Sequence, residues 1–487
     1  MEQYPARVLR HVFILYKDNQ LQLADVFFDD RIKEIRPVSD RVIDLKDIQS
    51  PQNWKIFKQQ MKTKPGPIPA GEIDGECMLL IPGAIDAHVH FNTPGYEDRE
   101  DFEHGSLAAA AGGVTMVMDM PCTSVPPVDS VHHLERKREA LRKRSLVDHA
   151  FWGGISGQMF SDPRNLEQTV DKLSDAGVVG FKSYFLSGMP DFSDLTVQQM
   201  QQAAMLVKKC GKMLAVHAED KKLVLERQKK FQQQQKNDWQ AYWFSRDIQA
   251  ERTAITNLVK ICQKTGCRIH IVHISSAAGV ELVRQAKSQG LPMSAETCPH
   301  YLHFTKSDFE NPAICNYLKT APPVKDHDDK EALWSGLSDG TLSFVTTDHA
   351  GCDPAKEKTS DNFWEVYGGI PGVEHRVAFL FSEGLKKGQL TLQQTVSLLA
   401  ENPAQFFAVS AQKGFLKAGF DADFALINLW TEQKISADLM HSKGKYTPFE
   451  GQLFTAAVNE TYLRGNCVYT QGQRKVEFGY GQWIKPN

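Results

Sequence analysis

The sequence predicts an α/β protein: a (β/α)8 barrel of the TIM type with a small β-sandwich domain formed by the N- and C-terminal segments. Between residues 79 and 404, short apolar runs alternate with segments of helical length and period. Before and after that region, strand-like runs are separated by turn residues instead. The apolar runs of the central region are continuous, which is typical of strands buried on both faces of a parallel sheet.

Eight runs in the central region have the character of strands, and helical segments such as 195–210 and 250–265 lie between most of them. Eight β/α units favour a closed barrel over an open sheet. An open dinucleotide-binding sheet is the alternative, but no G-x-G-x-x-G follows the first strand. The predicted strands are 85–90, 115–119, 149–155, 179–185, 213–217, 268–273, 292–297 and 343–348.

The two ends of the chain are each too short to bury a core alone, so we expect them to pair. Residues 1–78 and 405–487 are predicted to form one composite β-sandwich domain beside the barrel of residues 79–404. Residues 46–72 interrupt the strand pattern with four prolines and a polar segment. We interpret them as an inserted loop with room for one short helix.

Composition excludes several classes of function. The formal net charge of −3 gives no basic field for nucleic acid, so we expect no nucleic-acid partner. No apolar stretch is long enough to span a bilayer, and the start of the chain lacks a signal-peptide pattern, so we expect no membrane association. Nine cysteines without CxxC spacing favour reduced thiols and a cytoplasmic protein.

Chemistry-bearing side chains recur where the predicted strands end. In a barrel enzyme the carboxyl ends of the strands surround the active site. Any single residue has an ordinary explanation: a structural histidine, a lysine at the surface or a helix-capping aspartate. Their convergence on one mouth of the barrel predicts a metal site. The candidates are His88, His90, Lys182, His217, His273 and Asp348.

His88 and His90 are two residues apart, so strand periodicity places both on the inward side. His270 lies three residues before His273 on the same predicted strand. The same periodicity then points His270 to the opposite face, and we exclude it as a ligand.

Imidazole and carboxylate ligands suit zinc, with manganese, cobalt and iron as alternatives. A protonated lysine cannot bind a cation. A lysine that has reacted with CO2 becomes an anionic carbamate, whose two oxygens can bridge two metals. This gives Lys182 its most sensible role, and two adjacent metals would strongly lower the pKa of water.

These residues lie in motifs that resemble the cyclic amidohydrolases, namely the dihydroorotases, allantoinases and hydantoinases or dihydropyrimidinases. The resemblance covers nearly the whole chain. It implies a carboxylated Lys182 bridging two divalent metals, with His88 and His90 on one, His217 and His273 on the other, and Asp348 as both ligand and general base. The motifs are PGAIDAHVH (82–90), AAGGVT (110–115), GFK (180–182), VHAE (216–219), HIS (273–275), AETCPHY (295–301), TDH (347–349) and GFDAD (419–423).

Dihydroorotases hold their substrate carboxylate with an Arg two residues after the H-x-H, an Asn after a Met-Pro pair and a His four residues after the last barrel Asp. This chain has Asn92, Cys122 and Cys352 at those positions. Losing all three groups removes the charge-assisted contacts that a carboxylate needs. The resemblance to dihydroorotase therefore does not extend to its substrate.

Other segments resemble allantoinases, including HFNTPG (90–95), MPCTSVPP (120–127), FWGG (151–154) and KTAPP (319–323). YEDREDF (96–102) is closer to dihydroorotase, GIPGVEHR (369–376) is closer to hydantoinase, and the 46–72 insertion is typical of none of them. We therefore predict an allantoinase, with dihydroorotase and hydantoinase or dihydropyrimidinase as alternatives. Asn92 and the backbone around Ala321 and Gly368 would orient an uncharged ureide or imide edge.

A non-catalytic scaffold related to dihydropyrimidinase is a further alternative. Such relatives have lost metal ligands, whereas all six candidates are present here. The resemblance also implies a homodimer or homotetramer.

Overall fold

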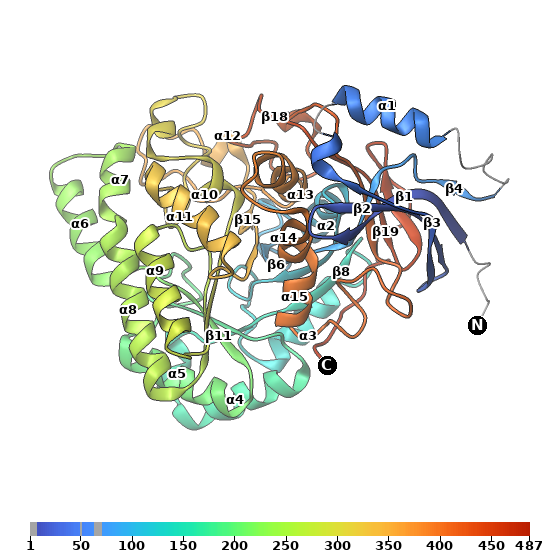
Figure 1. Cartoon of the computed structure of the whole chain (residues 1–487). Helices are drawn as coiled ribbons and strands as arrows, with labels where there is room; N and C mark the ends of the chain where they lie inside the picture. Colours follow the sequence, from blue (N-terminus) through green and yellow to red (C-terminus); the bar gives the residue numbers. More distant parts are fainter. Residues whose placement is uncertain (1–6, 49–50, 63–70) are drawn as a thin grey trace.

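The computed structural model describes residues 7–48, 51–62 and 71–487. Its centre is a ring of parallel strands with helices outside, as predicted (Figure 1). The ring follows the order of the chain. Its strands are β6 (Ala84–His90), β7 (Val114–Asp119), β8 (Asp148–Phe151), β9 (Gly153–Gly154), β10 (Phe181–Tyr184), β11 (Met213–His217), β12 (Arg268–Ile271), β13 (Met293–Thr297), β14 (Phe344–Val345) and β15 (His349–Ala350).

The third and eighth strands of the barrel are each interrupted, and these interruptions close the ring. One sheet has the order β15-β6-β7-β8 and the other has the order β14-β13-β12-β11-β10-β9. Only Trp152 separates β8 from β9, and residues 346–348 separate β14 from β15. Each interrupted strand pairs with both of its neighbours, so eight strand positions form a (β/α)8 barrel. Asp348 lies in the second interruption.

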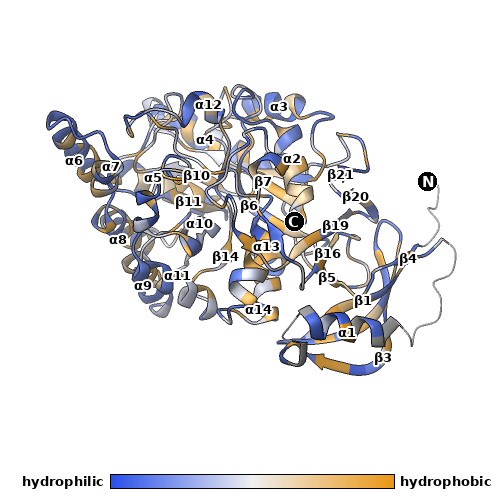
Figure 2. Cartoon of the chain, turned by 90° about the horizontal axis from the view of Figure 1, so that it is seen from above, coloured by the Kyte–Doolittle hydropathy of each residue, from blue (hydrophilic) through white to orange (hydrophobic). Residues whose placement is uncertain are grey.

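The outer helices start and stop where local chemistry favours it. Helix α8 (Ile248–Thr265) begins after Asp247, whose side chain accepts hydrogen bonds from two backbone amides, and ends at Gly266 with a φ of 63°. Figure 2 shows hydrophobic residues gathered on inner strands such as β6 and β7, whereas peripheral helices such as α6 (Lys221–Gln233) are largely hydrophilic. The further barrel helices include α2 (Phe102–Ala111), α3 (Val131–Ala140), α4 (Pro163–Ala176), α5 (Val197–Lys209), α9 (Ala277–Ser288) and α11 (His327–Ser338).

Strands from both ends of the chain share one nine-stranded sheet. Its order is β21-β20-β19-β16-β5-β1-β2-β3, and β4 pairs with β1. Strand β5 pairs with β1 on one side and with β16 on the other, so it joins the two ends of the chain. These strands are β1 (Arg7–Lys17), β2 (Gln20–Phe28), β3 (Ile32–Asp44), β4 (Ile73–Asp74), β5 (Leu79–Pro82), β16 (Phe424–Asn428), β19 (Ala457–Leu463), β20 (Asn466–Thr470) and β21 (Gln473–Arg474).

This sheet curls over a core of its own. The Phe28 ring on β2 lies 5.2 Å from the Phe424 ring on β16, although the two strands are not neighbours in the sheet. The two layers of the predicted sandwich are therefore parts of one curled sheet. The last residues of the chain leave it, because Trp483 pairs with His149 on β8 of the barrel. The domain boundaries at residues 78 and 405 remain predictions.

The predicted insertion contains the helix α1 (Pro51–Lys62), which is longer than the short helix expected. It is held by Trp54, whose ring lies 5.4 Å from Phe13 and 6.5 Å from Trp430. Residues 63–70 of the insertion lie outside the described part of the chain.

Within the described residues, no helix is both long enough and apolar enough to cross a bilayer.

Candidate active site

Three of the predicted residues meet at one end of the barrel. Asp348 Oδ1 lies 3.1 Å from His88 Nε2 and 3.0 Å from His90 Nε2. Both histidines come from β6, whose pairing with β7 shifts register between Asp86 and Val89. The three side chains offer ligand atoms within 4.8 Å of one another, which is close enough to hold a metal ion.

Two further histidines complete the cluster. His217 ends β11, and its Nδ1 atom lies 3.1 Å from Nε2 of His273. The His273 ring is 5.5 Å from the His88 ring, so the two pairs of histidines lie side by side. Lys182 on β10 is fully buried, and its Nζ has no hydrogen-bond partner among the described residues. Its amine lies 4.6 Å from the centre of the Tyr184 ring.

The orientation expected for His270 is wrong. Its Nε2 atom lies 3.1 Å from Glu296 Oε2, while the other carboxylate oxygen of Glu296 lies 2.6 Å from His88 Nδ1. His270 therefore faces the barrel interior, beneath the cluster rather than away from it. Strand β12 ends at Ile271, and His273 has a left-handed φ of 39°. That conformation breaks the two-residue alternation, so His270 and His273 point to the same side.

Two glutamates that were not among the predicted site residues hold these histidines. Glu296 on β13 contacts His88, and Glu219 lies 2.8 Å from Nε2 of His217 and forms an ion pair with Arg246. Both glutamates lie in motifs that were recognised, and Glu219 follows His217 by two residues. That spacing was an available signal for an inward position.

Hydrogen bonding fixes which nitrogen of His88 is free. Its Nδ1 donates to Glu296, as assigned from the contact network, so in the neutral ring Nε2 carries a lone pair. That lone pair faces a carboxylate oxygen of Asp348 at 3.1 Å. Two acceptors facing each other repel unless a cation lies between them. The same arrangement of imidazole and carboxylate is the donor set of zinc and similar metals.

The electrostatics of the cluster favour an ionised Asp348 and a neutral Lys182. Burial alone would raise the pKa of Asp348, but the neighbouring His88 and His90 outweigh burial and hold that pKa well below its ordinary value. Burial lowers the pKa of Lys182. A lowered pKa favours the neutral amine, which is the form that can react with CO2. The residues present therefore fit a metal centre with a modified lysine.

The predicted substrate contacts lie in three places. Asn92 is 1% exposed, and neither polar atom of its side chain has a hydrogen-bond partner among the described residues. Ala321 and Gly368 lie on neighbouring loops, which are joined by the hydrogen bond from Gly369 N to Lys319 O at 2.9 Å. In the described chain, none of the three predicted contacts hydrogen-bonds to the side chains of the histidine cluster.

The two cysteines that replace dihydroorotase contacts are buried. Cys122 Sγ lies 2.9 Å from the Tyr184 hydroxyl and 3.9 Å from Nδ1 of His90, so it borders the cluster. Cys352 Sγ donates to the Tyr446 hydroxyl at 3.5 Å instead. Neither thiol provides the positive charge or amide that a substrate carboxylate would need.

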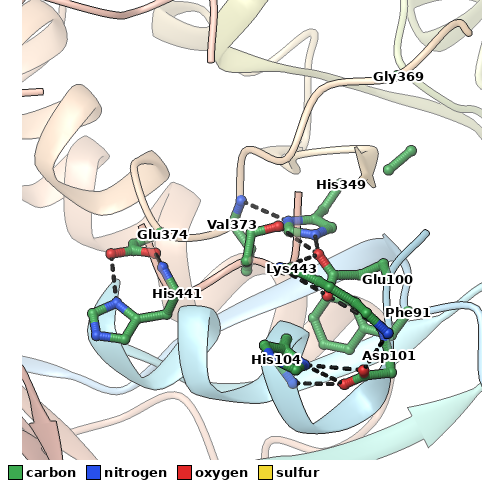
Figure 3. A network of polar contacts seen from close by, with 12 residues as sticks. Phe91, Glu100, Asp101, His104, His349, Gly369, Val373, Glu374, His441 and Lys443 are labelled. Carbon is green, nitrogen blue, oxygen red and sulfur yellow. Dashed lines mark hydrogen bonds and ion pairs between the residues drawn. The ribbon is translucent and has the colours of Figure 1, made fainter. Parts of the chain in front are cut away.

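A second group of acidic and histidine side chains lies beside the cluster, between α2 and the C-terminal region (Figure 3). His349 donates from Nε2 to Glu100 at 3.2 Å, because its Nδ1 accepts from Val373 N. The Lys443 ammonium is 3.2 Å from Asp101, and its backbone amide is 3.3 Å from Glu100. Lysine and backbone donors therefore already satisfy these carboxylates.

Fold and site together define a metal-dependent hydrolase of the barrel type, and comparison with known proteins identifies the family. Residues 79–468 match the Amidohydrolase family. The chain is 37% identical over 408 residues to an allantoinase of Deinococcus radiodurans, covering 83% of this chain and 88% of that protein. It is 33% identical over 416 residues to an L-hydantoinase of Paenarthrobacter aurescens, and the match covers 85% of this chain and 88% of that protein.

A solved structure is similar over almost the whole length. The L-hydantoinase (dihydropyrimidinase) from Arthrobacter aurescens superposes with a TM-score of 0.86 at 29% identity, covering 98% of this chain and 99% of that chain. The chain belongs to the amidohydrolase family. It is an enzyme of a metal-dependent family, and His88, His90 and Asp348 form a group that could hold a metal ion.

Proposed function

We propose that this protein is an allantoinase, which hydrolyses a ring amide of allantoin to give allantoate. Allantoinases of Deinococcus radiodurans and Bacillus velezensis are 37% and 35% identical to the chain over more than four-fifths of its length. The observation that carries the proposal is the cluster of His88, His90 and Asp348, together with Asn92 where a carboxylate-binding enzyme has Arg.

The proposed cofactors are two zinc ions. His88 and His90 would hold one, His217 and His273 the other, and a carboxylated Lys182 would bridge them. Asp348 lies 3.1 Å or less from both histidines of β6, which supports its role as an additional ligand. Divalent ions at this site would supply Lewis acidity and lower the pKa of water.

Asp348 is proposed to move the proton. As the water oxygen forms a bond to the ring carbonyl carbon, the carboxylate of Asp348 accepts a water proton. It then delivers that proton to the ring nitrogen as the carbon–nitrogen bond breaks. The ring opens to a carboxylic acid, which loses the second water proton to solvent and becomes the carboxylate, and the released nitrogen becomes an N–H of a neutral ureido group. The depressed pKa of Asp348 keeps the carboxylate ionised, so its oxygens carry no proton before water attacks.

Asn92 and the backbone at Ala321 and Gly368 are proposed to orient the substrate. Allantoin is an uncharged ureide with alternating carbonyl and N–H groups along its edge. An amide side chain and free peptide groups match such an edge without requiring a charge. The unpartnered, buried amide of Asn92 supports this role.

Ring opening of hydantoin or dihydrouracil is the second candidate, and the L-hydantoinase similarity favours it. The deciding experiment compares kcat/KM of the purified, metal-loaded protein on allantoin, hydantoin, dihydrouracil and dihydroorotate. We expect the highest value for allantoin and none above background for dihydroorotate. A higher value for hydantoin or dihydrouracil would replace the allantoinase assignment.

We also propose that the enzyme acts in the cytoplasm as a homodimer or homotetramer. Cys122, Cys298 and Cys352 are buried, free thiols, which suits a reducing compartment. Light scattering of the purified protein would give the number of subunits.

A further inference from the structure

Two buried lysines hold the loop that contains Gly368. The Lys319 ammonium contacts the backbone carbonyls of Phe363, Trp364 and Val366 at 2.6, 3.2 and 2.5 Å. The Lys358 ammonium contacts the carbonyls of Asn316, Tyr367 and Gly369 at 3.0, 2.8 and 3.0 Å. Each ammonium has three N–H groups, and each faces three carbonyl acceptors.

These lysines do not form ion pairs. Lys319 and Lys358 are 5% and 3% exposed, and among the described residues no carboxylate lies within ion-pair distance of either. Burial lowers the pKa of both to about 7. An apolar side chain of the same length would avoid burying a charge, so overall stability alone does not explain two lysines here. Their contacts instead fix the path of one loop.

We call these contacts of Lys319 and Lys358 with the backbone carbonyls the lysine clamp. Within residues 363–370, the clamp leaves the backbone of one residue without a hydrogen bond. The carbonyls of Val366, Tyr367 and Gly369 are held by the lysines, and the Gly369 amide donates to Lys319 O. In the described chain, the amide and carbonyl of Gly368 form no hydrogen bond, and Gly368 is exposed. A Cβ added at Gly368 would meet only Lys319 O, at 4.0 Å.

The neighbouring loop also contains a residue whose backbone forms no hydrogen bond. Ala321, two residues after Lys319, has no backbone hydrogen bond within the described chain, although Thr320 O accepts from the Tyr242 hydroxyl at 2.9 Å. Two residues with free peptide groups therefore flank the hydrogen bond that joins the loops.

Hydrogen bonds connect this pair of loops to the end of the eighth barrel strand. Ala350 N donates to Ile370 O at 3.1 Å. The Tyr446 hydroxyl contacts the carbonyls of both Ala350 and Gly369, at 3.2 and 2.9 Å. Asp348 lies two residues before Ala350. A shift of the clamped loop would therefore move the end of the strand next to Asp348.

We propose that Lys319 and Lys358 are positioning residues for substrate specificity, which hold the peptide groups of Gly368 and Ala321 in place for the donor and acceptor edge of a planar ureide. This inference rests on the proposed function. Fixing these groups before binding lowers the entropy lost on binding, so the lysines act on substrate affinity rather than on bond cleavage.

The test compares Lys358→Met and Lys319→Met with the matched control Lys356→Met. Lys356 lies on the short helix α12 (Pro354–Glu357), which ends just before Lys358, and its side chain is 79% exposed. For either clamp variant we expect KM for allantoin to rise about tenfold, which is the effect of roughly one lost hydrogen bond to substrate. We expect kcat to change less than about threefold, with metal content unchanged, because the metal ligands are elsewhere. The control should match wild type.

A general structural role would instead lower kcat, bound metal and melting temperature together, and that result would overturn the proposal. So would a KM within twofold of wild type in a folded clamp variant. If the methionine variants do not fold, Lys358→Gln replaces them, because glutamine keeps two N–H donors. We expect its KM for allantoin to lie between those of wild type and a tenfold increase. A KM equal to that of wild type would overturn the proposal.

Hydrogen–deuterium exchange gives a readout that does not depend on the substrate. We expect Lys358→Met to accelerate exchange in peptides covering 363–370 but not in peptides covering β11. Unchanged exchange in 363–370 would overturn the clamp itself. If wild type opens none of the tested rings, the proposed function fails while the exchange experiment still tests the clamp.

Discussion

Nδ1 of His88 and Oε1 of Glu296 lie 2.6 Å apart, and both side chains are fully buried. The other oxygen of Glu296 reaches His270, whose ring nitrogen Nδ1 lies 2.8 Å from Ser294 Oγ. This chain of contacts lies under the histidine cluster and sets the tautomer of His88. A carboxylate behind a metal-binding imidazole orients the ring and raises its basicity.

Replacing Glu296 with Gln tests that support. The amide keeps the shape but removes the negative charge, so we expect metal affinity to fall about 10- to 100-fold. Competition between the apo-protein and a metal-binding dye would measure this without an activity assay. Glu281→Gln, at an exposed position of α9, is the control. Equal metal affinity in wild type and Glu296→Gln would contradict the assigned role.

Lys182 should carry a CO2 adduct in the metal-loaded enzyme. Intact-mass analysis under neutral conditions should show the added mass of one CO2, which disappears after acidification. Lys182→Ala should lose the adduct and most of the bound metal, because it removes the proposed bridging ligand. An active enzyme without the adduct would remove the carbamate from the mechanism.

Asp348→Asn removes the proposed proton acceptor and keeps nearly the same shape. We expect kcat to fall by about 10²–10⁴-fold, the usual contribution of general acid–base catalysis. Circular dichroism should match wild type, and some metal should remain bound through the histidines. A variant that retains most of its kcat would show that another group accepts the proton.

The ion pair of Asp101 and His104 should stabilise the folded protein by an amount that depends on pH. Burial would raise the pKa of Asp101, but hydrogen bonds from His104 lower it from 3.8 to about 2. The hydrogen bond with Asp101 raises the pKa of His104 above 6.5. The aspartate contribution is therefore present above about pH 4 and lost as pH falls toward 2. The histidine contribution is present below pH 6.5 and lost at higher pH.

Asp101→Asn keeps the helix cap of α2 but removes the charge. Because His104 is half exposed, we expect a loss of only about 0.5 kcal/mol between pH 5 and 6, shrinking toward pH 8.5 as His104 loses its proton. Denaturant titrations at several pH values would measure it, with the exposed Asp98→Asn as control. A loss that grows toward pH 8.5 would disagree with this sign.

Lys413 is expected to be a major determinant of stability. It is 2% exposed and lies 2.6 Å from Asp148, 2.8 Å from Asp421 and 2.6 Å from Asp423. Lys413→Met leaves three clustered carboxylates without this cation, so we expect the free energy of unfolding to fall by about 3–5 kcal/mol. Asp148 begins β8, at the barrel end opposite the site, so KM should stay unchanged in the folded variant.

Urea unfolding of Lys413→Met beside the exposed Lys417→Met would measure that difference. A loss no larger than that of Lys417→Met would mean that the carboxylates are compensated by Arg464, which also contacts Asp148.

The sequence predicted the barrel and the place where its functional groups gather. Continuous apolar strands and the rule that strand ends surround a barrel site were enough to select His88, Lys182 and Asp348. His270 was oriented wrongly because the left-handed conformation of His273, which no local pattern indicates, resets the alternation. Periodicity describes a regular strand and fails where the strand ends.

Contacts between residues far apart in the chain could not be predicted from the sequence. Glu296 contacts His88, which lies more than two hundred positions earlier in the chain. Lys319 contacts the backbone of a loop that follows the eighth strand. An inward glutamate or a buried lysine has no local signature. The contacts of such residues depend on tertiary packing, which only the folded chain defines.

The position of β5 between β1 and β16 affects how the molecule is made. One edge of β5 remains unpaired until residues 424–428 have been synthesised, after the whole barrel. An open strand edge invites pairing with other chains. Only Gly83 separates β5 from β6, which carries His88 and His90. In a nascent chain, β16 is therefore the last strand to pair with β5, which immediately precedes the strand that carries His88 and His90. A chain that stops before residue 424 would keep the β5 edge open and be prone to aggregation.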